Sequence, residues 1–140
     1  MTAWENEWRI SEKGRCAYSI MSKPSTSTWF MNSKLNRKGI VFINRIIANH
    51  TLCASSLQRF NMVNDPVCEC QQNYETVQHK IFECEMCDRE SREEMLSELK
   101  KSGLSHAKDI RDILAISLKK KEFNALKAIC EFIIHNNIAI

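Results

Sequence analysis

Apolar residues recur at intervals of three and four positions along much of the chain, which is the spacing of an amphipathic helix. The clearest pattern lies in residues 40–50. One helical stripe of that segment consists of Ile43, Ile46, Ile47 and His50. This spacing predicts a helix that is mostly buried.

Two further long helices are predicted in the second half of the chain. Residues 87–101 begin with acidic side chains, end with lysines and are followed by Gly103, which indicates a helix with a defined stop. Ser105 is the expected N-cap of a helix over residues 108–117, and residues 122–136 form the last predicted helix. Shorter helical segments are expected around Trp4 and Trp8, over 54–60, and in the segment closed by His79 and Cys84.

Residues that favour turns or strands are scarce. The chain has only three glycines and two prolines, and alternating β-branched residues are few. A loop is expected from Gly14 through the Ser/Thr-rich run at 22–28, which Pro24 interrupts. We therefore predict an all-α fold, with a single domain over residues 1–140 and about six short helices.

Composition limits the class of protein. A chain of 140 residues with 44% hydrophobic and 26% charged residues is typical of one globular domain. No apolar run approaches the roughly 20 residues of a membrane span, so no membrane partner is expected. Charged side chains run through residues 1–20, which argues against a signal peptide. We expect an intracellular protein, nuclear or cytoplasmic and not secreted, in which the seven cysteines are more suited to metal binding than to disulfides.

The net charge of +3 is unevenly distributed. Residues 1–60 carry nine Lys/Arg and three Glu, whereas residues 61–140 carry eleven Lys/Arg and fourteen Asp/Glu. A basic half can contact the phosphates of a nucleic acid, although an uneven but merely solvated helical surface is the alternative. The candidate nucleic-acid-binding residues, which come near one side in helical geometry, are Lys34, Arg37, Lys38 and Arg45.

Residues 68–84 contain a set of side chains that suits a structural metal site. The candidate ligands are Cys68, Cys70, His79 and Cys84. Three thiolates and one imidazole are a set of four ligands that favours Zn²⁺ and leaves no open position for catalysis. Cys87 forms a second Cys-x2-Cys pair with Cys84 and is a possible substitute ligand. The alternative is that these are buried or incidental thiols with a surface histidine.

Several phrases of the sequence, taken in order, resemble one protein family. They are Trp4-x3-Trp8, Ser11-Glu-Lys-Gly-Arg15-x2-Tyr18, Thr28-Trp29-Phe30, Leu35-x-Arg37, Ile43-x-Arg45-Ile46-Ile47-x2-His50, Leu57-x-Arg59-Phe60, Cys68-x-Cys70, Glu75-Thr-Val-x-His79-x4-Cys84, Arg92, Ile113-Leu114 and Ala125-Leu-Lys-Ala-Ile-x2-Phe132-Ile. The chain resembles the C-terminal region, after ribonuclease H, of the reverse transcriptase polyproteins of insect-type non-LTR retrotransposons. The resemblance covers nearly the whole chain.

The resemblance implies a helical tail with a CCHC zinc-knuckle-like element that holds RNA or target DNA for the reverse transcriptase. By motif position, Cys68, Cys70, His79 and Cys84 would be its zinc ligands. The spacing of these residues departs from that of the compact retroviral knuckle, so the viral mode of RNA binding is not implied. The family phrase usually reads Gly-His where this chain has Asn49 before His50, which puts a tight turn there in question.

Other candidate residues have a simpler structural interpretation. His50 could form a ligand pair with Cys53, but a histidine at a helix end more often caps carbonyl groups or packs in the core. Aromatic side chains could stack on bases, but their spacing favours the core; these are Trp4, Trp8, Trp29 and Phe30. The remaining cysteines are expected to be small buried residues; these are Cys16, Cys53 and Cys130.

No enzyme active site is expected. Polymerase chemistry requires a carboxylate cluster such as Tyr-x-Asp-Asp, which the sequence lacks, and the acidic residues lie on predicted helix surfaces. A catalytic Cys–His pair has no third orienting residue in a recognisable phrase.

The sequence therefore predicts a non-catalytic, retrotransposon-derived domain with a structural Zn²⁺, which binds RNA or single-stranded nucleic acid. The alternative is a helical protein–protein interaction module whose zinc is purely structural. In that interpretation the C-terminal helix, with apolar residues at 138–140, docks a protein partner or a second copy of the chain.

Overall fold

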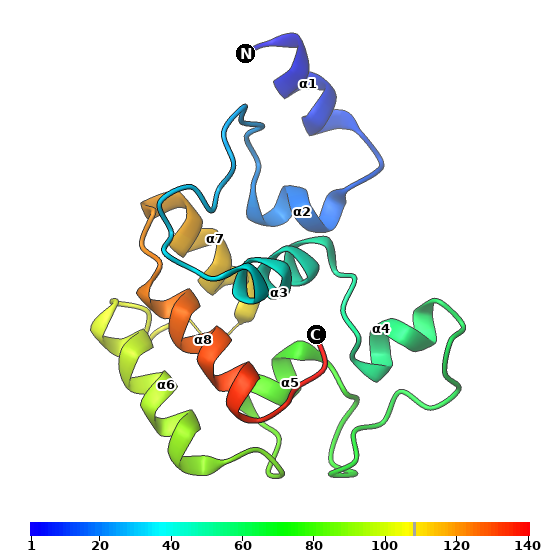
Figure 1. Ribbon diagram of the computed structural model, residues 1–140. Coiled ribbons are helices and arrows are strands. Elements are labelled where there is room, and N and C mark those ends of the chain that lie inside the picture. The colour runs from blue at the N-terminus through cyan, green and yellow to red at the C-terminus, as the bar shows by residue number, and fades with distance from the viewer. Residues whose placement is uncertain (108) are drawn as a thin grey trace.

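The computed structural model describes residues 1–107 and 109–140. Within these residues the chain forms helices and one isolated antiparallel bridge, between Val67 and Tyr74, so the predicted all-α fold is confirmed. The eight helices of the described residues are α1 (Ala3–Ile10), α2 (Arg15–Ile20), α3 (Arg37–Ala48), α4 (Ala54–Arg59), α5 (Val77–Phe82), α6 (Arg89–Lys101), α7 (Ile110–Lys120) and α8 (Asn124–His135) (Figure 1). None of the helices in this part of the chain is both long and apolar enough to cross a membrane.

Helix α2 occupies part of a stretch that was expected to be a loop. Gly14 adopts a left-handed conformation (φ 67°), and the helix begins at the next residue. Helix α2 has only six residues, and Ile20 is the one that is buried. A single buried position gives no helical periodicity that the sequence could show. The helix is held by tertiary contacts with α3 and α7, where Arg111 donates a hydrogen bond of 2.9 Å to Ser19 Oγ.

The capping predicted for α7 is wrong. The N-cap is Asp109, whose carboxylate accepts a hydrogen bond of 2.7 Å from the backbone N–H of Arg111, and Ser105 has no such role. The predicted first residue, Lys108, lies outside the described residues. Helix α7 also continues beyond the predicted end, because the helical conformation persists to Lys120 before Lys121 turns left-handed (φ 53°).

Aspartate capping also shifts the start of α6. Asp88 accepts a hydrogen bond of 2.7 Å from the backbone N–H of Ser91, which places Cys87 before the helix rather than in its first turn. The end of α6 is as predicted, with Lys101 in its last turn and Gly103 in a left-handed turn (φ 75°).

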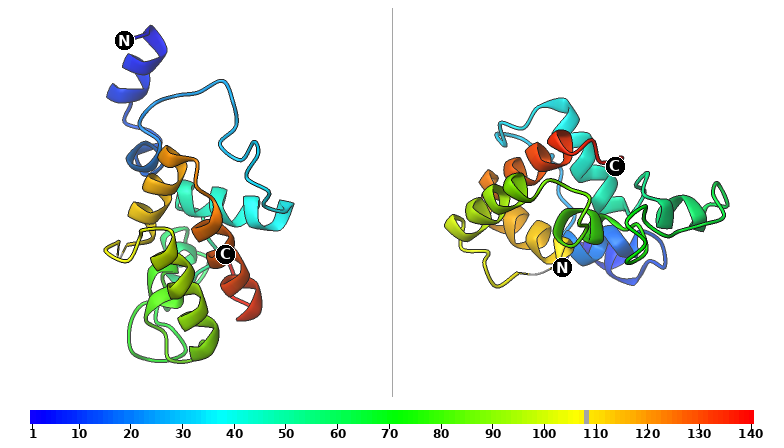
Figure 2. Two further views of the ribbon diagram at one scale, coloured as in Figure 1. Left: turned by 90° about the vertical axis from the view of Figure 1, so that its left-hand side faces the viewer. Right: turned by 90° about the horizontal axis from the view of Figure 1, so that it is seen from below.

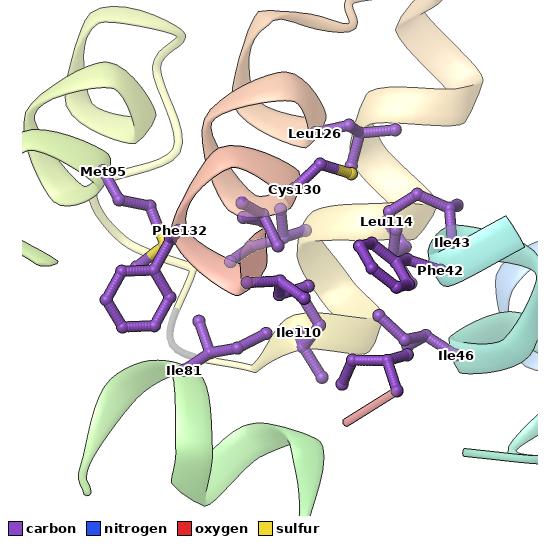
Figure 3. Close-up of a cluster of buried hydrophobic side chains, with 14 of the residues drawn as sticks. Phe42, Ile43, Ile46, Ile81, Met95, Ile110, Leu114, Leu126, Cys130 and Phe132 are labelled. Carbon is purple, nitrogen blue, oxygen red and sulfur yellow. The ribbon is translucent and has the colours of Figure 1, made fainter. Parts of the chain in front are cut away.

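The core lies where α3, α7 and α8 meet, and α5 and α6 extend it (Figure 3). Helix α8 is the most buried element, and it packs along α6 and across α3. Gly39 permits the close approach of α3 and α8, since a Cβ atom there would lie 3.3 Å from Cys130 Sγ. Large side chains that are fully buried include Ile43, Ile81, Met95, Ile113, Leu114, Leu126, Ile129 and Ile133.

Ile138 and Ile140 are covered by the chain itself, whereas docking of a partner through them would require them to be exposed. Asn137 adopts a left-handed conformation (φ 50°) and turns the chain back, so that Ile138 and Ile140 are only 6% and 2% exposed. Arg45 donates a hydrogen bond to the carbonyl of Ile140, and Cys53 donates its S–H to Ala139 at 3.6 Å. The feature that suggested docking through residues 138–140 is therefore absent.

The aromatic residues near the N-terminus are less buried than expected. Helix α1 has no buried residue and stands at one end of the molecule (Figure 2), and Trp4 is 50% exposed, so its assignment to the core is wrong. Trp8 is half-buried and donates a hydrogen bond of 3.0 Å to the carbonyl of Met21. Trp29 and Phe30 are half-buried and lie edge to face, with ring centroids 5.4 Å apart.

The isolated cysteines differ in burial. Cys53 and Cys130 are buried, as predicted, whereas Cys16 is exposed and contradicts the prediction. Burial raises the pKa of Cys53 to about 11 and that of Cys130 to about 12.

We expect this difference to be visible in alkylation rates. Of these three cysteines, iodoacetamide should modify Cys16 first, because burial shields the thiols of Cys53 and Cys130 and raises their pKa, which leaves little reactive thiolate. Mass spectrometry of the folded chain over time would measure the order of modification. Labelling of Cys130 as fast as Cys16 would contradict the burial of the α3–α8 contact.

Candidate metal centre

A tight turn and a short helix position the four candidate ligands. Cys68 and Cys70 lie in the turn between the bridged residues, which is closed by a hydrogen bond of 2.8 Å from the N–H of Gln71 to the carbonyl of Cys68. His79 lies in the first turn of α5, where its N–H donates to the side chain of the N-cap residue Thr76 at 3.0 Å.

Cys84 follows α5 directly. Its N–H donates a hydrogen bond of 2.8 Å to the carbonyl of His79. This bond at the end of α5 holds Cys84 close to His79, so that its thiol lies near the imidazole. Local backbone hydrogen bonds thus bring together donors that are up to sixteen residues apart in sequence.

The four donor atoms converge. The sulfur atoms and a ring nitrogen of Cys68, Cys70, His79 and Cys84 all lie within 4.8 Å of one another. The Cys68 and Cys84 sulfurs are 3.7 Å apart, and Cys70 Sγ lies 3.1 Å from His79 Nε2. In a tetrahedral zinc site with bonds of ~2.3 Å to sulfur and ~2.0 Å to nitrogen, the corresponding separations are ~3.8 and ~3.5 Å. The predicted ligands therefore form a cluster that can hold a metal ion.

Burial makes this a closed site. Cys68 and Cys84 are fully buried, His79 is 3% exposed, and Cys70 is half-buried. Four protein donors around one position complete a tetrahedron, which leaves no coordination position for a substrate. The arrangement suits a structural metal rather than a catalytic one.

Glu83 orients the histidine. Its Oε2 atom lies 3.3 Å from His79 Nδ1, so Nδ1 is the donor in this hydrogen bond and Nε2 presents its lone pair to the thiols. A carboxylate behind a metal-binding imidazole is a common outer-shell arrangement. Sequence reasoning missed Glu83, although its position four residues after His79 on a helix is a usable signal.

The surroundings favour thiolates at two of the three cysteines. The backbone N–H of Gln72, with His79 and Cys68, lowers the pKa of Cys70. Burial alone would raise the pKa of Cys84, but the N–H of Met86, the Cys68 thiol and Lys80 together lower it.

Cys68 holds its proton more strongly than Cys70 and Cys84 do, because its pKa is raised while theirs are lowered. Burial and the neighbouring thiols raise its pKa to about 11. Lys80 Nζ lies 3.9 Å from Cys68 Sγ; burial disfavours the charge of this ammonium, but its electrostatic interaction with the nearby cysteines, Cys84 first, raises its pKa.

Arg92 of α6 fixes the end of α5 beside the metal cluster. Its guanidinium donates to the carbonyls of Ile81 at 2.9 Å, Cys84 at 2.7 Å and Lys80 at 3.4 Å, and it lies 5.5 Å from the Phe132 ring centroid. This role was not foreseen, because nothing in the local sequence indicates which carbonyl groups an arginine on another helix will reach.

The other proposed ligands lie outside the cluster. Cys87 is buried, which raises its pKa, and its thiol is directed to the carbonyl of Lys80 at 3.4 Å. His50 is exposed beyond the end of α3, which contradicts its place on the predicted buried stripe, and its ring lies 4.6 Å from that of Phe60 at an angle of 39°. Cys53 donates its S–H to the carbonyl of Ala139.

The turn before His50 is formed despite the missing glycine. Asn49 adopts the left-handed conformation (φ 56°, ψ 38°), which asparagine tolerates better than most residues. The N–H of His50 then donates to the carbonyl of Arg45 at 2.9 Å and closes the end of α3.

The predicted nucleic-acid-binding residues separate into two places. Lys34, Arg37 and Lys38 are exposed around the start of α3, whose first turn contains no acidic residue. Arg45 lies two turns further along, about 10 Å from Lys38 along the helix axis, and its guanidinium is bonded to the carbonyl of Ile140. Three of the four residues therefore lie close together in the chain at the start of α3, and Arg45 lies apart from them.

The metal segment itself is acidic. Residues 65–88 contain one lysine and six carboxylates, which are Asp65, Glu69, Glu75, Glu83, Glu85 and Asp88. Three thiolates and a neutral imidazole around a divalent cation add a further negative charge. Phosphate groups would be repelled here, so a nucleic acid would contact a different part of the molecule.

Compared with known proteins, the chain matches no family model, no curated protein and no solved structure. The resemblance to a retrotransposon polyprotein therefore stays a prediction from the motif phrases.

Proposed function

We propose that the chain is a non-catalytic domain with a structural zinc ion, and that it binds RNA or single-stranded nucleic acid. The observation that supports the zinc is the convergence of Cys68, Cys70, His79 and Cys84 within 4.8 Å in a buried, closed setting. The set of three sulfurs and one nitrogen selects zinc over the hard cations that prefer oxygen. The ion would join the 66–76 turn to α5 and supply no reaction chemistry.

The nucleic-acid part of the proposal depends on the exposed cations Lys34, Arg37 and Lys38. In the described part of the chain, none of the three side chains is engaged in an ion pair, so their charges are available to phosphates. The motif phrases that resemble the retrotransposon polyprotein tail support the same partner. We propose on this basis that the chain derives from such a tail and lacks its polymerase and ribonuclease H sites.

We expect the triple variant Lys34→Gln, Arg37→Gln, Lys38→Gln to bind a single-stranded oligonucleotide more weakly than the wild type. Each phosphate neutralised on a single strand contributes about 0.7 to the slope of log affinity against log salt, so the slope should fall by about 2. Fluorescence anisotropy across a salt series measures both quantities.

A matched control removes the same charge elsewhere. Lys119, Lys120 and Lys127 are exposed on α7 and α8, and their joint replacement by Gln should leave the slope nearly unchanged. Equal losses in both triple variants would reject the α3 surface and indicate attraction by net charge alone. No binding by the wild type would reject the nucleic-acid function.

A further inference from the structure

A pocket of about 320 Å³ lies between the end of α3, helix α4 and the starts of α5 and α7, and apolar and polar side chains both line it. This volume is near the lower end of the ~300–1,000 Å³ typical of small-molecule sites. The pocket is separate from the metal cluster, although both use α5, and Figure 1 shows α4 projecting to one side of α3.

Two arginines line the pocket and are held in place by main-chain carbonyls. Arg59 donates to the carbonyl of Asn49, and Arg111 donates to the carbonyls of Cys16 and Ile46. These bonds fix both guanidinium groups without neutralising them. Among the described residues neither arginine forms an ion pair, so the pocket is lined by two arginines whose charge no carboxylate neutralises.

Residues with hydroxyl groups also line the pocket. Thr51 and Ser56 are buried and bond to each other at 2.9 Å. The Ser55 Oγ atom is buried and has no hydrogen-bond partner among the described residues. A buried hydroxyl without a partner is unfavourable, and an acceptor oxygen that reached it would satisfy it.

The charged residues of the lining favour an anionic ligand. Asp109 is the one carboxylate in the pocket, and its side chain caps the N–H of Arg111. Gln78 accepts the N–H of Ile110, so the first N–H groups of α7 are already used. Two guanidiniums and one carboxylate leave the lining with one net positive charge, and the donors available to an anion are side chains.

We propose that this pocket binds a phosphate group. The planar guanidinium donors of Arg59 and Arg111 match phosphate oxygens, and the Ser55 hydroxyl supplies a further donor. The phosphate could come from a nucleic-acid backbone or from a free nucleotide, and only the first source depends on the proposed function. In that case the pocket is a second contact, in addition to the α3 surface.

The test is a titration of the zinc-loaded, ¹⁵N-labelled full chain with inorganic phosphate, AMP and, as the uncharged control, adenosine. We expect phosphate and AMP to shift the amide resonances of Ser55 and Arg59, and adenosine to leave them unchanged. Arg59→Gln should weaken phosphate binding about tenfold, because it removes a charge-assisted donor. Arg59→Lys should retain part of the affinity, and Ser55→Ala should weaken it less than Arg59→Gln does.

Arg89→Gln is the matched control, since that side chain is 92% exposed on α6 and outside the pocket. Helical circular dichroism and zinc content establish that each variant is folded. The proposal is overturned if the wild type shows no saturable phosphate-dependent shift, or if Arg59→Gln binds phosphate as tightly as Arg89→Gln does.

A competition experiment distinguishes the two sources. Displacement of AMP by a short oligothymidylate supports the pocket as a backbone-phosphate site, and binding of AMP that the oligothymidylate does not displace supports it as a nucleotide site. Inorganic phosphate reports on the pocket without any oligonucleotide. Failure of the pocket is therefore distinguishable from failure of nucleic-acid binding at α3.

Discussion

Replacement of Cys84 by Ser is expected to abolish stoichiometric zinc binding and to unfold the segment that contains the four ligands. A structural zinc site contributes an apparent binding free energy on the order of 10 kcal/mol at neutral pH, which is comparable to the whole stability of a domain. Residues 66–76 contain few apolar side chains that could replace this contribution. Metal analysis of the purified chain measures zinc content, and urea unfolding followed by circular dichroism measures stability.

The control for Cys84→Ser is Cys16→Ser, which makes the same chemical change at an exposed thiol outside the cluster. It should retain one zinc per chain and wild-type stability. His79→Ala should behave like Cys84→Ser, whereas Glu83→Gln should retain zinc with an affinity 10- to 100-fold lower, because Glu83 only orients the imidazole. A well-folded wild type without zinc, or zinc retained in Cys84→Ser, would contradict the site.

Acidification should release the metal, because protons compete for the same lone pairs. This direction agrees with the surroundings of Cys70 and Cys84, which lower the pKa of both thiols. A thiol whose pKa is lowered by folding stabilises the folded state at pH values above its pKa in the unfolded chain, which is near 9. This stabilisation is lost as the pH falls through the pKa of the thiol in the folded chain. Cys68 has the opposite sign, since its pKa is raised to about 11, and its proton must leave when zinc binds.

Arg92→Met is expected to cause the second large loss, about 3 kcal/mol of unfolding free energy. The substitution keeps an apolar side chain near Phe132 but removes the guanidinium donors to the carbonyls of Ile81 and Cys84 at the end of α5. Buried acceptors without partners cost about 1–3 kcal/mol each, and water can compensate only in part. Urea denaturation gives the loss in stability, and competition with a chelator shows whether zinc affinity falls as well.

Arg89→Met is the comparison for this substitution. Arg89 starts the same helix and pairs with Glu93 at 3.0 Å, but its side chain is 92% exposed, so its loss should change stability far less. Similar stabilities for the two variants would show that Arg92 does not hold α5 against α6.

The helices that could be predicted from the sequence are those with a long apolar stripe. Ile43, Ile46 and Ile47 are buried as their spacing predicts, and α8 buries most of its apolar residues. Helix α2 was missed because one buried residue leaves no periodic signal, and its stability depends on α3 and α7. The start of α7 was misplaced because Ser105 and Asp109 both have cap chemistry, and the local sequence does not distinguish between them.

The candidate metal cluster was the part of the site that the sequence determined by itself. Cys68, Cys70, His79 and Cys84 have a type and spacing that two local elements, a turn and a short helix, are sufficient to bring together. Ligand chemistry and short-range backbone geometry are both encoded locally, so no knowledge of the distant chain was needed.

The tertiary structure alone decided what surrounds that cluster. Arg92 reaches α5 from another helix, the end of the chain folds back onto Arg45, and Arg59 and Arg111 meet at one pocket although 52 residues separate them in sequence. Burial of Ile138 and Ile140 likewise follows from a left-handed turn at Asn137. Contacts between distant segments depend on how whole helices pack, and a pattern of residue types does not specify that packing.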